Sequence, residues 1–173
     1  IDKDKASYLE LDMPFDKENR PIYYMNVGKM SYNHKDNTLK DMIPVVKEIL
    51  NQHKGEKGII HTGNYDIAHK LEKGLDNDRL KLHNSYDRDL VLKEHLENDE
   101  DTVLVSPSMF TGVDLKDDAS RFQIIAKMPF PNMGSDKIKS RMKMNPKWYT
   151  WQTVNDLVQS YGRSVRNHDD HAV

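Results

Sequence analysis

Short, mostly apolar runs recur along the chain and are separated by longer segments. Runs of this kind are typical of strands that are buried on both faces. They cover residues 57–62, 102–105 and 122–126, and an aromatic and branched run over 21–27 predicts another strand after an irregular entry. Residues 79–83 alternate weakly between apolar and polar side chains. The pattern therefore predicts several short strands.

The longer segments carry apolar residues at helical spacing. Residues 38–53 form one such segment, with Asn37 as a candidate N-cap. Pro44 is expected to bend or shorten this helix, because proline lacks the backbone N–H that a helix interior uses. A turn at residues 63–64 precedes a second predicted helix, which runs to about Gly74.

Two further helices are predicted to turn one apolar face inward. The first is the charged segment 87–98, and the second begins near Trp148 and continues through Arg166. Helical periodicity brings residues three or four positions apart onto one face. The predicted inward residues are Leu90, Val91 and Leu96 in the first helix, and Trp151, Val154, Val158, Tyr161 and Val165 in the second.

The alternation of strands and helices predicts an α/β layered fold with a mostly parallel sheet. A length of 173 residues suits one domain that spans residues 1–173. In such sheets ligands bind beyond the carboxyl ends of the strands, so the polar residues that directly follow each strand are the first candidates for a site. These are Thr62, Gly63 and Asn64, then Ser106 and Ser108 with Gly112 and Asp114, and finally the stretch 159–170.

Composition narrows the possible functions. The chain has no apolar run long enough for a transmembrane span or a signal peptide, so a membrane is not an expected partner. The net charge is −2, so any nucleic-acid surface must be a local patch. The absence of cysteine excludes disulfides and cysteine-ligated metal in this chain, and it fits a cytoplasmic protein. The start at Ile1 and a strand-like ending at 171–173 suggest a fragment of a longer protein.

Several local patterns are weaker. Residues 27–31 fail as a phosphate loop, because Tyr23 stands where that loop needs glycine and Met30 where it needs Ser or Thr. The basic patch 137–143 is either a solvated helix that starts at Asp136 or a contact to a nucleic-acid backbone. His168 and His171 with the two adjacent aspartates are a poor metal site, and Asp169 or Asp170 is better suited to orienting an arginine or the adjoining loop.

The stretch from Gln159 to Arg166 is chemically the most distinctive. On a continuous helix, Gln159, Gly162, Arg163 and Arg166 would share one face. Glycine leaves room for close approach, and two guanidinium groups are planar, permanently charged donors that suit phosphate oxygens. The alternative is a solvated arginine face that forms weak, exposed ion pairs with nearby aspartates.

Three motifs in order resemble those of superfamily 2 helicases of the DinG/XPD-like branch. The loop Ser108-Met-Phe-Thr-Gly-Val-Asp-Leu115 is followed by Ile124-Ile-Ala-Lys-Met-Pro-Phe-Pro131 and then by the Gln159–Arg166 stretch. Lys57-Gly-Ile-Ile-His-Thr-Gly-Asn-Tyr65 resembles a fourth motif of that branch. The resemblance covers roughly residues 10–170 and implies the second, C-terminal RecA-like domain, a three-layer sandwich, of an ATP-dependent DNA helicase.

The resemblance also implies roles for individual residues. Arg166 would be the arginine finger that reaches the γ-phosphate of ATP, Arg163 its partner in neutralising charge, and Gln159 a group that positions nucleotide or water. Gly112 and Asp114 would contact the nucleotide. The residues implied to hold the phosphates of single-stranded DNA are Thr62, Gly63, Asn64, Ser106 and Ser108.

The remaining parts of such a motor would lie outside this chain. The resemblance implies that the N-terminal RecA-like domain of the same protein is a partner and carries the phosphate loop and most of the Mg²⁺ site. Many members of the branch also hold an iron–sulfur cluster in that other part. Two alternatives stay open: an RNA-remodelling ATPase of another superfamily 2 branch, and a non-enzymatic RecA-like module whose arginines only hold phosphate.

Overall fold

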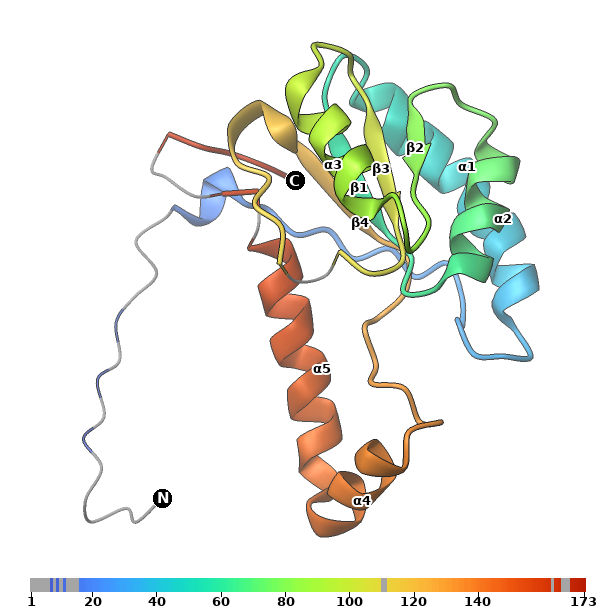
Figure 1. Ribbon diagram of the computed structural model, residues 1–173, viewed down its shortest axis with the longest axis vertical. Coiled ribbons are helices and arrows are strands. Elements are labelled where there is room, and N and C mark those ends of the chain that lie inside the picture. Colours follow the sequence, from blue (N-terminus) through green and yellow to red (C-terminus); the bar gives the residue numbers. More distant parts are fainter. Residues whose placement is uncertain are drawn as a thin grey trace.

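A parallel sheet flanked by helices forms the centre of the chain (Figure 1). The computed structural model describes residues 7, 9, 11, 16–109, 112–162, 164, 165 and 169–173. Within these residues the strands are β1 Gly58–His61, β2 Leu80–Leu82, β3 Val103–Ser106 and β4 Phe122–Ile125. The α-helices are α1 Lys35–Gln52, α2 Tyr65–Leu75, α3 Arg88–Glu97, α4 Asp136–Met144 and α5 Pro146–Tyr161.

The strands lie in the order β2-β3-β1-β4, and every pair is parallel. The register places His61 beside Ser106 on one side and beside Ile125 on the other. The carboxyl ends of β1, β3 and β4 therefore meet at one edge of the sheet. The predicted α/β class, the three layers and the mostly parallel sheet are all confirmed.

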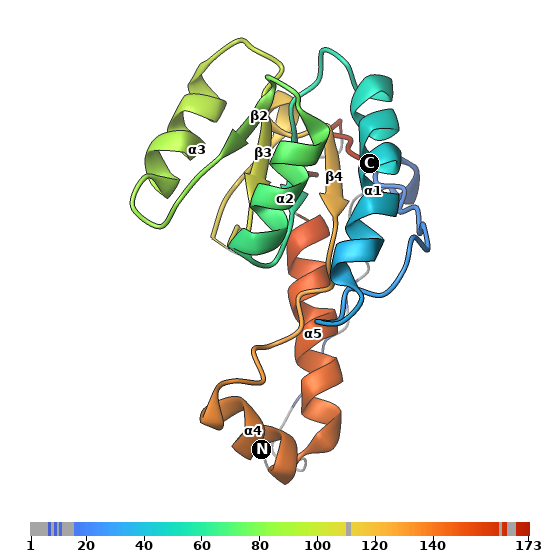
Figure 2. The same cartoon turned by 90° about the vertical axis from the view of Figure 1, so that its right-hand side faces the viewer.

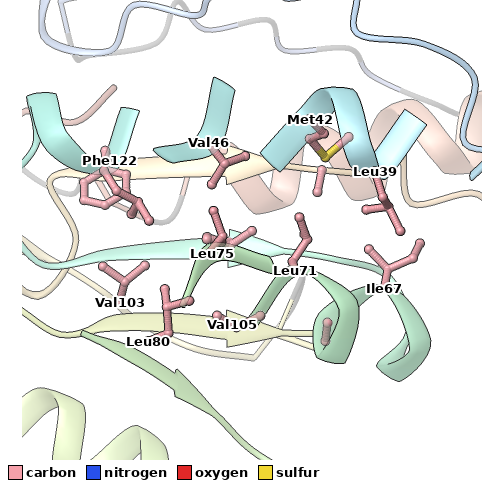
Figure 3. Close-up of a cluster of buried hydrophobic side chains, with 14 residues drawn as sticks. Leu39, Met42, Val46, Ile67, Leu71, Leu75, Leu80, Val103, Val105 and Phe122 are labelled. Atoms are coloured by element: carbon pink, nitrogen blue, oxygen red, sulfur yellow. The ribbon is translucent and has the colours of Figure 1, made fainter. Parts of the chain in front are cut away.

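Two apolar clusters hold the layers together. On one face α1 and α2 pack against the sheet through the larger cluster (Figure 3). On the other face Ile59 and Leu104 of the sheet meet the loop residues Met109 and Leu115, with Val91 of α3 packed against them. Gly58 is required at the start of β1, because a Cβ atom there would lie 2.5 Å from the ring of Phe122.

The predicted strand over residues 21–27 is wrong. Residues 21–30 form neither helix nor strand, and Ile22, Tyr23 and Tyr24 are 70%, 70% and 88% exposed. Aromatic and branched residues favour a strand only where they find a neighbouring strand and a covered face. In the described structure residues 21–27 pair with no strand, and only Val27 among them packs against the core, so composition alone misled the prediction.

Helix α1 begins earlier than predicted and passes through its proline. Its N-cap residue is His34, so Asn37 lies inside the first turn and the predicted cap is wrong. Pro44 neither ends nor shortens the helix, which continues to Gln52. The buried face formed by Leu39, Met42, Val46 and Leu50 offsets the one hydrogen bond that proline removes.

Helix α3 buries a histidine, while two of its three leucines are exposed. Leu90 and Leu96 are exposed, contrary to prediction, while Val91 packs against the core as predicted. His95 is buried, with Nδ1 2.7 Å from the Thr102 hydroxyl and Nε2 2.9 Å from the Ala119 carbonyl oxygen. A carbonyl only accepts, so Nε2 carries the proton and Nδ1 accepts from the Thr102 hydroxyl.

His95 is expected to make the fold sensitive to mild acid. Burial lowers the pKa of the His95 imidazole below its ordinary value of 6.5, and the nearby Lys57 lowers that pKa further, against an opposing hydrogen bond to Ala119. Just below pH 6.5 the His95 imidazole of the unfolded chain binds a proton, whereas the buried imidazole of the folded chain stays neutral. The free energy of unfolding should therefore fall as the pH drops from 6.5 towards the lower folded pKa.

Urea unfolding at pH 7.5 and 5.5 measures this loss. Replacing His95 by Gln should flatten the pH dependence, whereas replacing the exposed His69 by Gln should leave it unchanged. An equal pH dependence in the wild type and in His95→Gln would contradict the assignment.

Helix α5 extends away from the sheet, and α4 packs against it at the far end (Figures 1 and 2). Asp136 starts α4 as predicted. The predicted inward face is wrong for Trp151, Val154 and Val158, which are 62%, 50% and 41% exposed. Tyr161 is half-buried, and Val165, beyond the end of the helix, is buried as predicted. Helix α5 leaves the sheet, and within the described residues no layer covers its exposed apolar face (Figure 1). In the described residues, no helix is long and apolar enough to cross a membrane.

Candidate nucleotide and nucleic-acid interface

The candidate site lies at the carboxyl edge of the sheet, where the loops after β1, β3 and β4 converge. These loops and α5 line a shallow groove. Its lining residues are Gly63, Pro107, Lys127, Met128, Pro129, Phe130, Pro131 and Asp156. The groove brings together two segments that resemble helicase motifs, residues 57–65 through Gly63 and residues 124–131 through Lys127 to Pro131.

The loop after β1 is held by Thr62 and Asn64. Thr62 is buried, its hydroxyl donates to the Asn64 carbonyl oxygen at 3.2 Å, and its backbone N–H donates to the Ser106 carbonyl oxygen at 2.9 Å. The Asn64 side-chain oxygen caps α2 by accepting from Ile67 N at 2.9 Å. Gly63 is exposed with φ +73°, a conformation that glycine adopts without strain. Thr62 therefore shapes the turn, and Gly63 forms the surface beside the start of α2.

The loop after β3 is organised by Ser106. Its buried hydroxyl oxygen accepts from the backbone N–H groups of Ser108 at 3.3 Å and Met109 at 3.0 Å, and it lies 2.8 Å from His83 Nε2. The other ring nitrogen of His83 donates to the Asn84 carbonyl oxygen at 2.9 Å. In the neutral ring Nε2 is thus the acceptor, and the Ser106 proton points to it. Ser106 fixes the loop, and Ser108 is the exposed hydroxyl.

The Gly-Val-Asp-Leu loop alternates between the core and the surface. Val113 and Leu115 are buried against the sheet, while Gly112 and Asp114 are exposed. Gly112 has φ +80°, and apart from its chain neighbours no described residue has a heavy atom within 4 Å of the place its Cβ would occupy. Two apolar anchors thus hold an exposed glycine and carboxylate in place.

Helix α5 ends before the two arginines, which corrects the predicted helical face. Its last residue is Tyr161, and Gly162 is the C-cap, with its N–H 3.3 Å from the Val158 carbonyl oxygen. Gln159 is exposed in the last turn, whereas Arg163 and Arg166 lie outside the described residues. Gln159, Gly162, Arg163 and Arg166 would share one face only if the helix continued past Gly162. Glycine is a poor helix former and ends this helix instead of separating two arginines upon it.

A glutamine on β4 fastens the end of α5 to the sheet. The Gln123 amide donates to Ser164 Oγ at 2.5 Å and to the Tyr161 carbonyl oxygen at 3.4 Å. Its oxygen lies 3.3 Å from His61 Nε2 on β1. Ser164 and Val165 are buried. The chain immediately on both sides of Arg163 is therefore bound to the sheet.

A buried ion pair fastens the next part of the segment. The Asp170 carboxylate is fully buried and lies 2.8 Å from Nη1 of Arg121, and it also accepts from the backbone N–H of Asp117 at 3.2 Å. Val173 continues along β4, donating to the Arg121 carbonyl oxygen and accepting from Gln123 N. The prediction that Asp169 or Asp170 orients an arginine is confirmed for Asp170, with Arg121 as the partner.

Three of these residues were missed by the sequence analysis. Gln123 gave a signal, since it is the one polar residue in the strand Phe122–Ile125. His83 and Arg121 gave none, because each gains its role from a partner that is distant in the sequence. The described residues contain no group of three His, Asp or Glu side chains that would hold a metal ion. The predicted sharing of Mg²⁺ with another domain stays a prediction.

Comparison with known families decides the classification. Residues 42–173 match the family described as the helicase C-terminal domain. The chain belongs to this family. The matched range contains the candidate loops after β1, β3 and β4 and the whole stretch 159–170.

Solved structures agree with this helicase C-terminal domain in fold. The structure of S. tokodaii Xpd4 superposes with a TM-score of 0.61 at 16% identity, over 85% of this chain and 31% of that one. A structure of an XPD helicase gives a TM-score of 0.61 at 16% identity, over 82% of this chain and 28% of that one. The predicted RecA-like fold is thus confirmed, and the domain spans less than a third of either relative. No curated protein matches the sequence.

Proposed function

We propose that this helicase C-terminal domain is the second motor domain of an ATP-dependent DNA helicase similar to XPD. The observation that carries the proposal is the family match over residues 42–173, which includes both the Gly-Val-Asp-Leu loop and the Gln159–Arg166 stretch in the expected order. The parallel sheet supports it, because its carboxyl edge gathers the loops that would contact ligands.

The arginines would act on ATP bound by another domain. Phosphoryl transfer depends on positioning and on stabilising the charge that spreads over the transferred group. We assign Arg166 as the arginine finger, Arg163 as a second positive charge and Gln159 as a group that positions nucleotide or water. ATP with Mg²⁺, bound mainly by the N-terminal domain, would supply the phosphoryl group. The bonds from Gln123 to residues on both sides of Arg163 support a fixed direction of approach.

Because the arginine finger would come from a different domain than the bound ATP, hydrolysis would be coupled to movement of the two domains. The finger completes the site only when the two domains close on the nucleotide. Gly112 and Asp114, exposed on an anchored loop, would contact the nucleotide and respond to its state. Repeated closure would then move a strand held at the same edge of the sheet.

Single-stranded DNA would lie along the carboxyl edge. Gly63, Asn64 and Ser108 are placed on the loops of that edge, where backbone N–H groups, an amide and a hydroxyl suit phosphate oxygens. Thr62 and Ser106 are buried and their hydroxyls are hydrogen-bonded within the protein, so we assign them the role of fixing the conformation of the two loops. Contacts of this kind need no large net charge, in agreement with the pI of about 6.5.

Strand separation by the intact protein tests the function. A duplex with a single-stranded 5′ tail should be unwound when ATP is present and should stay paired with a non-hydrolysable analogue. Replacing the DNA tail by RNA separates the helicase proposal from an RNA-remodelling ATPase. ATP hydrolysis that separates no DNA substrate, with or without an RNA tail, would contradict the proposal.

A further inference from the structure

The segment that links β4 to α5 forms an arm that reaches beyond the sheet. Residues 127–155, which we call the basic arm, leave the carboxyl end of β4, form α4, and return as most of α5 (Figure 2). Helix α4 packs against α5, away from the sheet. The arm therefore starts at the candidate groove and points away from the core.

Charge is distributed very unevenly between the basic arm and the rest of the chain. The arm holds six of the 26 Lys and Arg residues and one of the 28 Asp and Glu residues. The remaining chain has 20 basic residues against 27 acidic ones, so the arm is positive and the rest is negative. A polyanion would therefore be attracted to the arm and repelled elsewhere.

The cations of the arm are presented to solvent. Helix α4 carries Lys137, Lys139, Arg141 and Lys143, all exposed, and Lys147 is exposed at the start of α5. The single acid, Asp136, pairs with Lys139 at 3.3 Å. The half-buried Ile138 and Met142 mark the face of α4 that is turned away from solvent. The lysines and the arginine flank that face on both sides. They could therefore contact the phosphates of a flexible single strand from more than one direction.

Aromatic contacts hold the arm and connect it to the groove. Phe130 stacks on Tyr149 with ring centres 5.6 Å apart and planes 14° apart, and the Tyr149 hydroxyl donates to the Pro131 carbonyl oxygen at 3.1 Å. Arg141 lies over the Trp148 ring, 5.2 Å from its centre. Phe130 also lines the groove beside Gly63. The basic surface is thus continuous with the edge of the sheet.

We propose that the basic arm binds the sugar-phosphate backbone of the nucleic acid that leaves the groove. The proposal rests on the function proposed above, in which the groove edge holds a single strand. The part of α5 that belongs to the arm, residues 146–155, is about 15 Å long at 1.5 Å per residue. At about 3.4 Å per nucleotide, that length has room for roughly four nucleotides of one strand. Lysine ammonium groups act as point charges and suit regularly spaced phosphates without reading sequence.

The salt dependence of binding tests the arm in the intact protein. The variant carries Lys137→Gln, Lys139→Gln, Arg141→Gln and Lys143→Gln, and its binding to an oligo-dT strand is measured between 50 and 200 mM salt. Each lost phosphate contact to a single strand lowers the slope of log K against log salt by about 0.7. The slope should therefore flatten by roughly 3 if all four contacts are made.

A matched variant controls for net charge. Lys40→Gln, Lys47→Gln, Lys54→Gln and Lys73→Gln remove the same charge from exposed positions outside the basic arm, in or next to α1 and α2. This control should keep the wild-type slope, and both variants should keep the wild-type unfolding midpoint and the wild-type ATP turnover without DNA. Equal slopes in the wild type and the arm variant, or equal flattening in the control, would overturn the proposal.

Other outcomes separate this inference from the proposed function. If the arm variant loses binding to poly-glutamate but binds oligo-dT as the wild type does, the arm serves an acidic protein, and the proposal is overturned. If the wild type hydrolyses ATP, and its slope of log K against log salt for oligo-dT equals that of the arm variant, only the proposal for the arm is overturned. The proposed motor function is then unaffected. A wild-type protein without nucleic-acid binding would contradict the proposed function itself.

Discussion

Replacing Arg166 by Ala should nearly abolish DNA-stimulated ATP hydrolysis by the intact protein. An arginine finger contributes about 10³–10⁵-fold to the rate of phosphoryl transfer, because it stabilises charge that develops only in the transition state. Binding of ATP depends mainly on groups of the other domain and should change little. The loss should therefore appear in kcat at saturating ATP, with the dissociation constant of a non-hydrolysable analogue retained.

Two comparisons make this result specific. Arg166→Lys keeps the charge but loses the planar donors, so it should recover only part of the rate. Arg88→Ala removes a half-buried arginine of α3 that is not among the candidate site residues, and it should leave turnover unchanged. Unchanged turnover in Arg166→Ala would show that the finger is assigned to the wrong residue.

Replacing Arg121 by Ala should cause the largest loss of stability among single changes in this region. The Asp170 carboxylate is fully buried, and the Arg121 side chain is 17% exposed. Removing one partner leaves the other charge buried without compensation, which costs about 3–5 kcal/mol. Two backbone N–H groups, of Asp117 and His171, still donate to Asp170, so we expect a value near the lower end.

Urea unfolding with an exposed ion pair as the control measures this loss. Arg88 pairs with Asp89, whose side chain is 90% exposed, so Arg88→Ala should cost less than about 1 kcal/mol. A loss in Arg121→Ala no greater than that in Arg88→Ala would contradict the role of the buried pair.

The buried strands were the easiest elements to predict from the sequence. The runs that became β1, β3 and β4 are apolar on both faces, which in a parallel sheet requires covering helices on both sides. The turn before α2 was also readable, because Asn64 is a preferred cap and does cap the helix. These elements depend on local pattern, and local pattern was sufficient.

The errors share one physical cause, which is that exposure depends on neighbours. The 21–27 run has strand-like composition but pairs with no strand in the described structure, and Trp151 has helical spacing but lies on a helix that leaves the core. Periodicity gives the shape of an element, whereas burial depends on what packs against it. The end of α5 at Gly162 is a third case, since a tertiary bond from Gln123 to Ser164 holds the chain in its new direction.

Some residues of the candidate site could be predicted from the sequence, and others could not. The described residues named from the ordered motifs lie at the end of β3, on the loops after β1 and β3, or, for Gln159, in the last turn of α5. The residues that support them, His83, Gln123 and Arg121, act through partners that are 23 to 62 positions away in the sequence. Such partners become visible only once the register of the sheet is known.

We propose that this helicase C-terminal domain is one half of an ATP-driven DNA motor. ATP turnover by the intact protein at saturating ATP, measured with and without single-stranded DNA, tests this proposal. We expect turnover to rise when the DNA is added, because a bound strand favours closure of the two domains. Turnover that is absent under both conditions, or the same with and without DNA, would contradict it.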